Sequence, residues 1–261
     1  MRSAGYEIVL MKRRLKAFGL HLCGSAGVLL LVLGTLYLGW YRWPGWYLTG
    51  APHVLLLTVT VDIVLGPLLT FAVASPGKPG RVLARDIVCI VALQVVALSY
   101  GTLTLWDGRP LYYTYSVKEL SVTQGIDLQP EEVASALESN PDFAPHWYSR
   151  PRWAWAPLPQ DKEAADSIVQ SAIEGGFDVT AMPRYFRPWQ QGASDLRKHL
   201  QKVGSLGYFS KKEREALKKS LQRYGFDPEA ADTMPMTGHG TPLLAVFDLK
   251  TLQIKALLRA D

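Results

Sequence analysis

The sequence predicts an α-helical membrane anchor of three transmembrane helices followed by a small α+β extracytoplasmic domain. Two observations carry this prediction. The first 106 residues contain three long segments with almost no fixed charge. The other 155 residues mix short apolar runs with amphipathic stretches, a pattern typical of a folded domain. We therefore divide the chain into a basic tail at 1–16, a membrane region at 17–106 and an exported domain at 107–261.

The apolar segments cover about 17–41, 52–75 and 87–106. The first and the third have no charged side chain, and the second has only Asp62. A helix rises ~1.5 Å per residue, so about 20 residues cross the ~30 Å hydrocarbon layer. A cleaved signal peptide does not fit, because the first segment is too long and two apolar segments follow it. We expect all three segments to span a membrane.

The distribution of charge predicts the orientation. The chain has a formal net charge of +5, but residues 1–106 carry +6 and residues 107–261 carry −1. The excess lies in the basic tail and in the 75–86 connection, and positive residues stay on the cytoplasmic side. Residues 40–47 are instead rich in tryptophan and tyrosine, which gather at membrane interfaces. We predict a multi-pass protein of the bacterial inner membrane, with a cytoplasmic amino terminus, membrane lipid around its helices and a periplasmic C-terminal domain. Because that domain is nearly neutral, no nucleic-acid partner is expected.

The exported domain combines strand and helix signals. Strand-like runs cover 111–122, 243–248 and 252–258, and the last two form a predicted hairpin. Helix signals begin at Pro130 and cover 161–174, 194–203 and 210–224. The proline-rich segment 140–159 predicts an ordered loop or an edge strand. Neither cysteine lies in this domain, so we expect no disulfide in it.

No catalytic or metal-binding pattern is visible. The five histidines lack ligand spacing, and the chain has no glycine-rich phosphate loop and no nucleophile elbow. We therefore expect no catalytic residues, no metal and no cofactor. Glutamates interleave with the basic run 211–223, which favours a solvated helix face over a site for an acidic partner. For the tryptophan-rich segment 147–155, packing onto the core is favoured over a recognition surface.

Asp62 is the candidate functional residue of the membrane region. An ionisable side chain near the middle of a bilayer is costly unless it is paired or protonated. Counting along the helices places Asp62 ~20 Å deep, level with Ser99 and Tyr100. The same count places His21 only ~8 Å deep, so a level pair with Asp62 is not expected.

Two roles stay open for Asp62. As a structural residue it would be protonated, or hydrogen-bonded to Ser99 or Tyr100, and would hold the helices together. As a functional residue it would contact a partner or take part in a proton-linked process. Gly66 and Pro67 follow it and should kink or loosen the helix, which would open a groove beside the carboxyl.

The run from Val61 to Thr70, VDIVLGPLLT, resembles the TfpX/TfpZ family of type IV pilin accessory proteins. Its Asp-x-x-x-Gly-Pro element is the most specific part of the resemblance. Weaker matches are the opening Met11-Lys12-Arg13, the Pro76-Gly77-Lys78 turn, Tyr100-Gly101, the run Gly108-Arg109-Pro110 that leaves the third helix, and Pro183-Arg184-Tyr185-Phe186. Residues 1–10 precede the usual start of that family, which leaves Met1 and Met11 as alternative initiators. The 116–120 strand lacks the aspartate–arginine pair expected there.

The resemblance implies a non-enzymatic accessory to pilin assembly or pilus dynamics, with type IV pilin as its partner. Pilins combine an apolar membrane helix with a periplasmic head, and a chain with membrane helices and an exported domain can contact both. In this hypothesis Asp62, Gly66 and Pro67 meet the pilin helix or its cationic amino terminus. Two rival interpretations are a proton-linked membrane carrier or enzyme that uses Asp62, and a sensor whose periplasmic domain binds a small ligand.

Overall fold

The computed structural model describes residues 2–75, 78–117 and 119–260. Pro76 and Gly77 of the Pro76-Gly77-Lys78 match, and Lys118 of the 116–120 strand, lie outside these ranges. The chain forms two compact units. The first comprises Met1–Gly39 and Ala51–Trp106, and the second comprises Trp40–Gly50 and Asp107–Asp261. The second unit is therefore built from two separate stretches of sequence.

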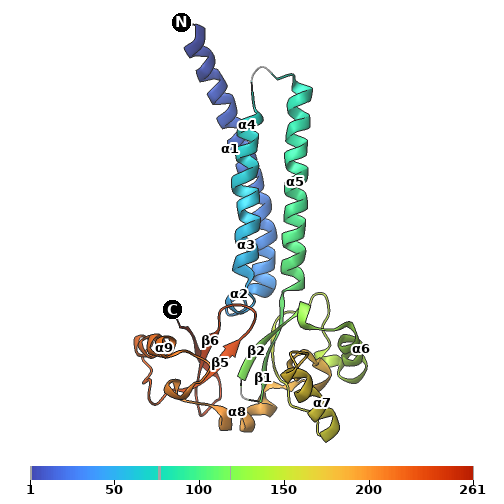
Figure 1. Cartoon of the computed structure of the whole chain (residues 1–261), viewed down its shortest axis with the longest axis vertical. Helices are drawn as coiled ribbons and strands as arrows, with labels where there is room; N and C mark the ends of the chain where they lie inside the picture. The colour runs from blue at the N-terminus through green and yellow to red at the C-terminus, as the bar shows by residue number, and fades with distance from the viewer. Residues whose placement is uncertain (1, 76–77, 118, 261) are drawn as a thin grey trace. The chain divides into compact units, whose positions relative to one another are not determined.

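Three long apolar helical paths form the first unit, and they run side by side in Figure 1. Helix α1 (Arg2–Leu36) continues into a π-helical turn, η1 (Tyr37–Tyr41). The second path joins α3 (Ala51–Val59), the π-helical segment η2 (Thr60–Leu65) and α4 (Gly66–Val73). The third is α5 (Gly80–Asp107). All three are long and apolar enough to cross a membrane by length and composition, which confirms the three long apolar helices predicted.

The first unit is held together by aromatic and small residues. The rings of Phe18 in α1 and Phe71 in α4 meet edge to face with centroids 6.4 Å apart. Where α5 approaches α3, a Cβ on Gly101 would lie 2.3 Å from the Thr58 hydroxyl oxygen. Glycine at this point lets the two backbones come close, as small residues do between membrane helices.

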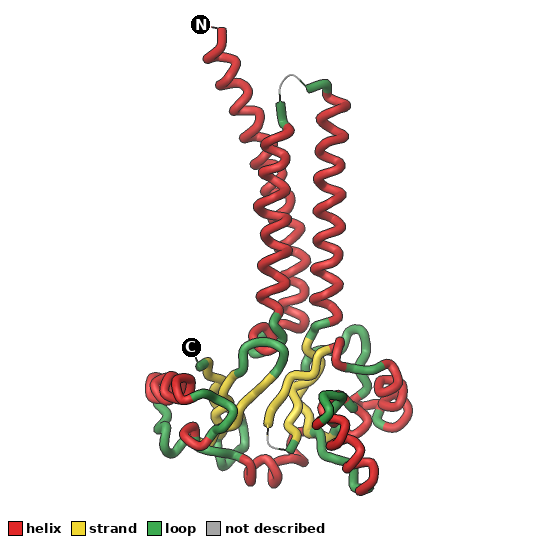
Figure 2. The backbone as a smooth tube through the Cα atoms, viewed as in Figure 1, coloured by secondary structure: helices red, strands yellow, loops and turns green. Residues whose placement is uncertain are grey.

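A mixed sheet of seven strands forms the second unit, with its strands in yellow in Figure 2. The order across it is β4-β3-β1-β2-β5-β6-β7. Strand β1 is parallel to β3 and β2 is parallel to β5, whereas the other neighbours are antiparallel. The strands are β1 (Pro110–Ser116), β2 (Glu119–Gln124), β3 (Arg152–Trp155), β4 (Arg187–Pro188), β5 (Asp232–Thr237), β6 (Leu243–Phe247) and β7 (Ile254–Arg259).

The predicted C-terminal hairpin is confirmed, because β6 and β7 pair antiparallel with Leu244 opposite Leu258. The region 111–122 contains two paired strands, β1 and β2. The segment 140–159 contributes β3, which lies one strand inside the edge. Strands β4 and β5 were not predicted.

Except for the first, short helix, which was not predicted, the described helices of the second unit follow the sequence signals. They are the short α2 (Gly45–Leu48), α6 (Pro130–Ser139), α7 (Lys162–Ile173), α8 (Ala193–His199) and α9 (Lys211–Arg223). Helix α8 ends four residues before the predicted Val203. The backbone turns extended at Leu200, and Gln201 exchanges two 2.9 Å main-chain hydrogen bonds with Thr233. A pairing distant in sequence thus replaces the last turn of this helix.

Apolar side chains cover both faces of the sheet. In β6, Leu243 and Ala245 point into one core, which also contains Leu48. The alternate residues Leu244 and Val246 point into another core, beneath α9. A third core packs around β1 and β3. This alternation is the two-residue period of a strand buried on both faces.

The connection Trp40–Gly50 is an integral part of the second unit. Leu48 is fully buried and Tyr41 is nearly so. The amide of Gly240 donates to the Leu48 carbonyl at 2.7 Å, and the Trp40 indole donates to the Ser149 carbonyl at 2.6 Å. The aromatic composition predicted a location at the membrane interface but gave no sign of this packing.

Candidate functional site in the apolar helices

Asp62 lies in η2, where the helix changes its hydrogen-bond register. The amide of Gly66 donates to the carbonyl of Val61, five residues earlier. The same register would direct the next amide to the Asp62 carbonyl, but Pro67 has no N–H. Gln94 of α5 supplies the missing donor, with its Nε2 3.1 Å from the Asp62 carbonyl oxygen. The proline therefore creates a main-chain acceptor that a neighbouring helix uses.

Gly66 makes room for this donor. A Cβ built on Gly66 would lie 2.1 Å from Gln94 Nε2, far inside contact distance. The Asp-x-x-x-Gly-Pro element thus has a physical explanation in this chain. Its proline frees a carbonyl, and its glycine admits the amide that pairs with it.

A chain of polar side chains extends from Gln94 across the first unit. Its Oε1 accepts from His21 Nε2 at 2.6 Å, since an amide oxygen has no proton to donate. On the other side of the ring, His21 Nδ1 lies 2.5 Å from the Thr70 hydroxyl oxygen. Gln94 Nε2 also lies 3.4 Å from Ser25 Oγ. These bonds join α1, α4 and α5 in an otherwise apolar setting.

The Asp62 carboxyl lines a groove of about 480 Å³. The residue is only 4% exposed, and its Oδ2 has no hydrogen-bond partner among the described residues. The groove walls are mainly apolar and come from α1 and α5; they include Ala17, Leu20, Gly24, Val28, Ile87, Val91, Val95 and Leu98. A buried carboxyl oxygen without a partner is costly unless the carboxyl is protonated or a ligand brings a donor.

The structure does not bring Ser99 or Tyr100 to Asp62. Both side chains are exposed on α5. The count along the helices gave their depth but not their direction around the helix axis. Ser99 is five residues beyond Gln94, which turns it by roughly 140° away from the Gln94 face.

Sequence reasoning missed Gln94, and it placed His21 too shallow to matter. A lone amide in the uncharged segment 87–106 was the signal that could have identified Gln94. His21 reaches the site through Gln94 and is not directly hydrogen-bonded to Asp62. Residues from α1, the second helical path and α5 therefore form the site, whereas the sequence predicted no residue of α1 and expected Ser99 and Tyr100, not Gln94, from α5.

The Gly108-Arg109-Pro110 run links α5 to the sheet. The Arg109 carbonyl accepts from the Gly125 amide at 2.9 Å, and the Gly108 carbonyl accepts from the Gln124 side chain at 2.5 Å. Burial lowers the pKa of the Arg109 guanidinium, while Asp107 raises it. Pro110 begins β1, where its missing N–H falls at the strand start. The contacts of this run are structural, because they attach the start of β1 to the end of β2.

Two features of the second unit, the tryptophan-rich segment 147–155 and the basic run 211–223, each show elements of both interpretations. Trp153 and Trp155 pack on the main core, but Trp147 is 72% exposed. In α9, Lys218 lies 3.7 Å from Glu215 and 3.3 Å from Glu229, whereas Lys212, Lys219 and Arg223 are exposed. Across the described ranges, no group of three or more His, Cys, Asp or Glu residues could hold a metal ion.

Comparison with known proteins gives three similar sequences. Two are named fimbrial assembly protein, of serogroups I and E1 of Dichelobacter nodosus, and each is 24% identical over 250 residues. Each alignment covers 94% of this chain and 95% of the relative. A third, the fimbrial assembly protein of serogroups C1 and C2, is 26% identical over 121 residues, which is 46% of this chain and 92% of that protein.

No family model matches the chain. No solved structure gives a significant match either. The similarity to proteins named for fimbrial assembly therefore stands on sequence alone, and it extends along nearly the whole chain.

Proposed function

We propose that this protein is a non-enzymatic accessory protein of type IV pilin assembly in the bacterial inner membrane. The observation that carries the proposal is the similarity to fimbrial assembly proteins over 94% of the chain. Three helices of sufficient length and apolarity support the membrane location. The basic residues at 1–16 and 78–85 support a cytoplasmic amino terminus and a periplasmic second unit.

The groove beside Asp62 is the proposed contact for the membrane helix of pilin. Its apolar walls suit an apolar helix, and its unpaired Asp62 Oδ2 suits a donor or a cationic group on that helix. The amino terminus of pilin is the proposed donor, because a charge-assisted hydrogen bond in a low dielectric is strong. In this proposal the second unit contacts the pilin head.

Site-specific photo-crosslinking in cells tests this contact. Val91 and Val95 line the groove, and a crosslinker at either position should give an adduct with pilin. Leu93 is the matched control, because it is exposed on α5 but does not line the groove. Equal adducts from all three positions would contradict binding in the groove. If no position gives an adduct while Asp62→Ala still abolishes piliation, Asp62 is structural.

The carboxyl itself is tested by Asp62→Asn. This variant keeps the size of the side chain and the Gln94 bond to the main chain, so the protein level should not change. We expect a lower yield of pilin adduct from Val91. A proton-linked carrier predicts instead that vesicles containing the native protein show proton flux that Asp62→Asn abolishes.

A further inference from the structure

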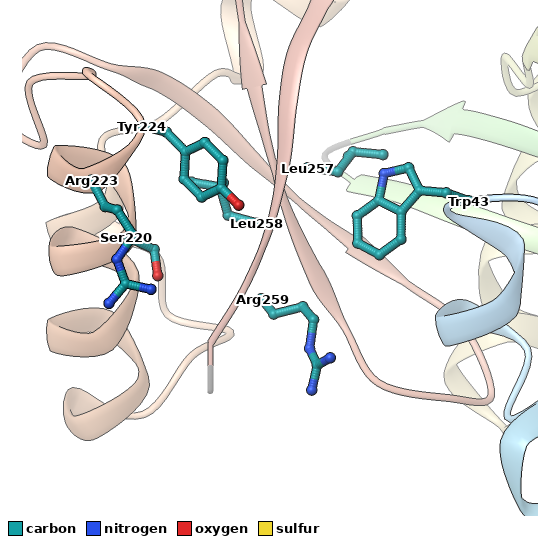
Figure 3. A pocket seen from close by; sticks show the side chains of 7 residues that line it. All are labelled: Trp43, Ser220, Arg223, Tyr224, Leu257, Leu258 and Arg259. Carbon is teal, nitrogen blue, oxygen red and sulfur yellow. The ribbon is translucent and has the colours of Figure 1, made fainter.

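A pocket of about 350 Å³ lies within the second unit at the end of β7. Its lining, drawn in Figure 3, combines three stretches distant in sequence. Trp43 comes from the connection Trp40–Gly50, and Ser220, Arg223 and Tyr224 come from the end of α9. Leu257, Leu258 and Arg259 come from β7. None of these side chains is acidic.

The polar part of the pocket suits a phosphate group. Arg223 and Arg259 bring two guanidinium groups, which point the same way in Figure 3, and Ser220 and Tyr224 bring hydroxyls. Arg259 is held in position, because its Nη1 donates to the Tyr47 hydroxyl at 2.9 Å and its guanidinium lies 4.5 Å from the centre of that ring. The forked donors of a guanidinium match the oxygens of a phosphate.

Two further basic side chains of α9 lie on the same helix face as Arg223. Lys212 and Lys219 are exposed on the α9 face that carries Arg223. Lys219 lies four residues before Arg223, and Lys212 lies seven residues before Lys219. Lys218, whose neighbours are Glu215 and Glu229, lies off this face. Glu215 lies between Lys212 and Lys219 in the sequence, so acidic side chains interleave with the basic run along α9.

The apolar part of the pocket distinguishes a lipid from a free ion. Trp43 is 47% exposed, and its indole faces Leu257 in Figure 3. Inorganic phosphate has no apolar part that could pack against these walls. The glycerol and the first methylenes of a phospholipid can pack against them, which adds to the binding free energy. Trp43 also follows the first apolar helical path, which ends at Tyr41, by two residues, or at most ~7 Å of extended chain. Tryptophan favours the headgroup level of a bilayer.

We propose that this pocket binds the phosphate headgroup of an anionic phospholipid. The inference rests on the membrane location in the proposed function but not on pilin contact. The headgroup phosphate lies between Arg223 and Arg259, and the start of its acyl region lies against Trp43 and Leu257. Clusters of basic residues close to a membrane surface attract anionic headgroups.

The test uses the full-length protein in detergent, with retained lipid counted by native mass spectrometry. Phosphatidylglycerol and phosphatidylcholine are the two probes. We expect retention of phosphatidylglycerol over phosphatidylcholine, and a loss of roughly fivefold for each arginine removed in Arg223→Gln and in Arg223→Gln/Arg259→Gln. The control Lys211→Gln/Lys250→Gln removes the same charge from exposed sites outside the pocket and should retain the lipid. Replacing Arg259 also removes its hydrogen bond to Tyr47 and could destabilise the second unit. The single variant Arg223→Gln keeps that bond, so a loss of lipid in it does not come from misfolding.

Three results would overturn the lipid site. They are equal retention in every variant, equal loss in the control variant, and displacement of phosphatidylglycerol by millimolar inorganic phosphate. The last would assign the pocket to a free anion. Resistance of the protein to alkaline carbonate extraction reports membrane insertion separately. Membrane insertion without any preference for phosphatidylglycerol would contradict the lipid site and leave the proposed function intact.

Discussion

At the scale of single residues, Gly66 leaves the least room for an added Cβ among the described glycines of the first unit. Alanine there would place a Cβ 2.1 Å from Gln94 Nε2. We expect Gly66→Ala to destabilise the helix assembly by about 1–3 kcal/mol, the usual cost of overpacking. The measurement is the fraction of protein that stays monodisperse after heating in detergent.

Two variants show whether this loss comes from the Gln94 contact. Gly34→Ala is the control, because no atom lies within 4 Å of its added Cβ, and alanine favours a helix. In a Gln94→Ala background, Gly66→Ala should cost less than in the native chain, since its steric partner is gone. An equal cost in both backgrounds would contradict the assigned contact.

Asp248 gives a residue-scale prediction about pH. Its Oδ1 accepts from the Lys250 amide at 2.8 Å, and Lys255 Nζ lies 3.2 Å from its Oδ2. These interactions lower the pKa of Asp248 below its usual 3.8. A carboxyl with a lowered folded-state pKa adds stability above its unfolded-state pKa and loses it as pH falls through the folded-state value.

Asp248→Asn should therefore lower Tm at pH 7, and the difference should shrink as pH falls below 3.8. Tryptophan fluorescence follows the second unit, because seven of the eight tryptophans belong to it. Asp166→Asn on the exposed face of α7 is the control and should leave Tm nearly unchanged. If the Tm difference between Asp248→Asn and the native protein stays constant with pH, the stabilisation by Asp248 does not come from its ionised carboxylate.

At the scale of elements, helix α9 depends on a capping box. The Ser210 hydroxyl accepts from the Glu213 amide at 3.3 Å, and the Glu213 carboxylate accepts from the Ser210 amide at 2.7 Å. We expect Ser210→Ala to lower the free energy of unfolding by about 1 kcal/mol, the usual value of such a cap. Denaturant titration followed by tryptophan fluorescence measures it. Ser139→Ala is the control, because that hydroxyl donates only to the Ser135 carbonyl within its own helix.

Elements with a local signal were predictable, and elements made by distant pairing were not. The α9 start, the apolar helices and the β6–β7 hairpin all follow from neighbouring residues. Strand β5 carries Pro235 at its centre, which argues against an interior strand. It is tolerated because β2 pairs with β5 only at Met236 and Thr237, beyond the proline.

The same distinction applies to the candidate site. The Asp-x-x-x-Gly-Pro element was visible in the sequence, but the groove beside Asp62 is walled mainly by α1 and α5 and is not lined by Gly66 or Pro67. The partner Gln94 was not visible, because depth along a helix does not give the angle around it. That angle is set by packing between helices, as at Gly101 and Thr58.

At the scale of the whole molecule, the second unit depends on a segment that lies between two apolar helices. Leu48 is 0% exposed in its main core. We expect Leu48→Ala to destabilise this unit by about 2–5 kcal/mol, the cost of removing a fully buried leucine side chain. Limited proteolysis of residues 107–261 in membranes measures the loss. Leu137→Ala, at a half-exposed site on α6, should have little effect.

The split composition of the second unit also sets the order of events during synthesis. Tyr47 is made early, but its partner Arg259 follows 212 residues later. At about 5–20 residues per second, the connection waits roughly 10–40 s before its last contact exists. A chain that stops before β6 lacks Leu243, Ala245 and Phe247 of the core that contains Leu48, so the connection Trp40–Gly50 is fully packed only when synthesis of the last strands is complete.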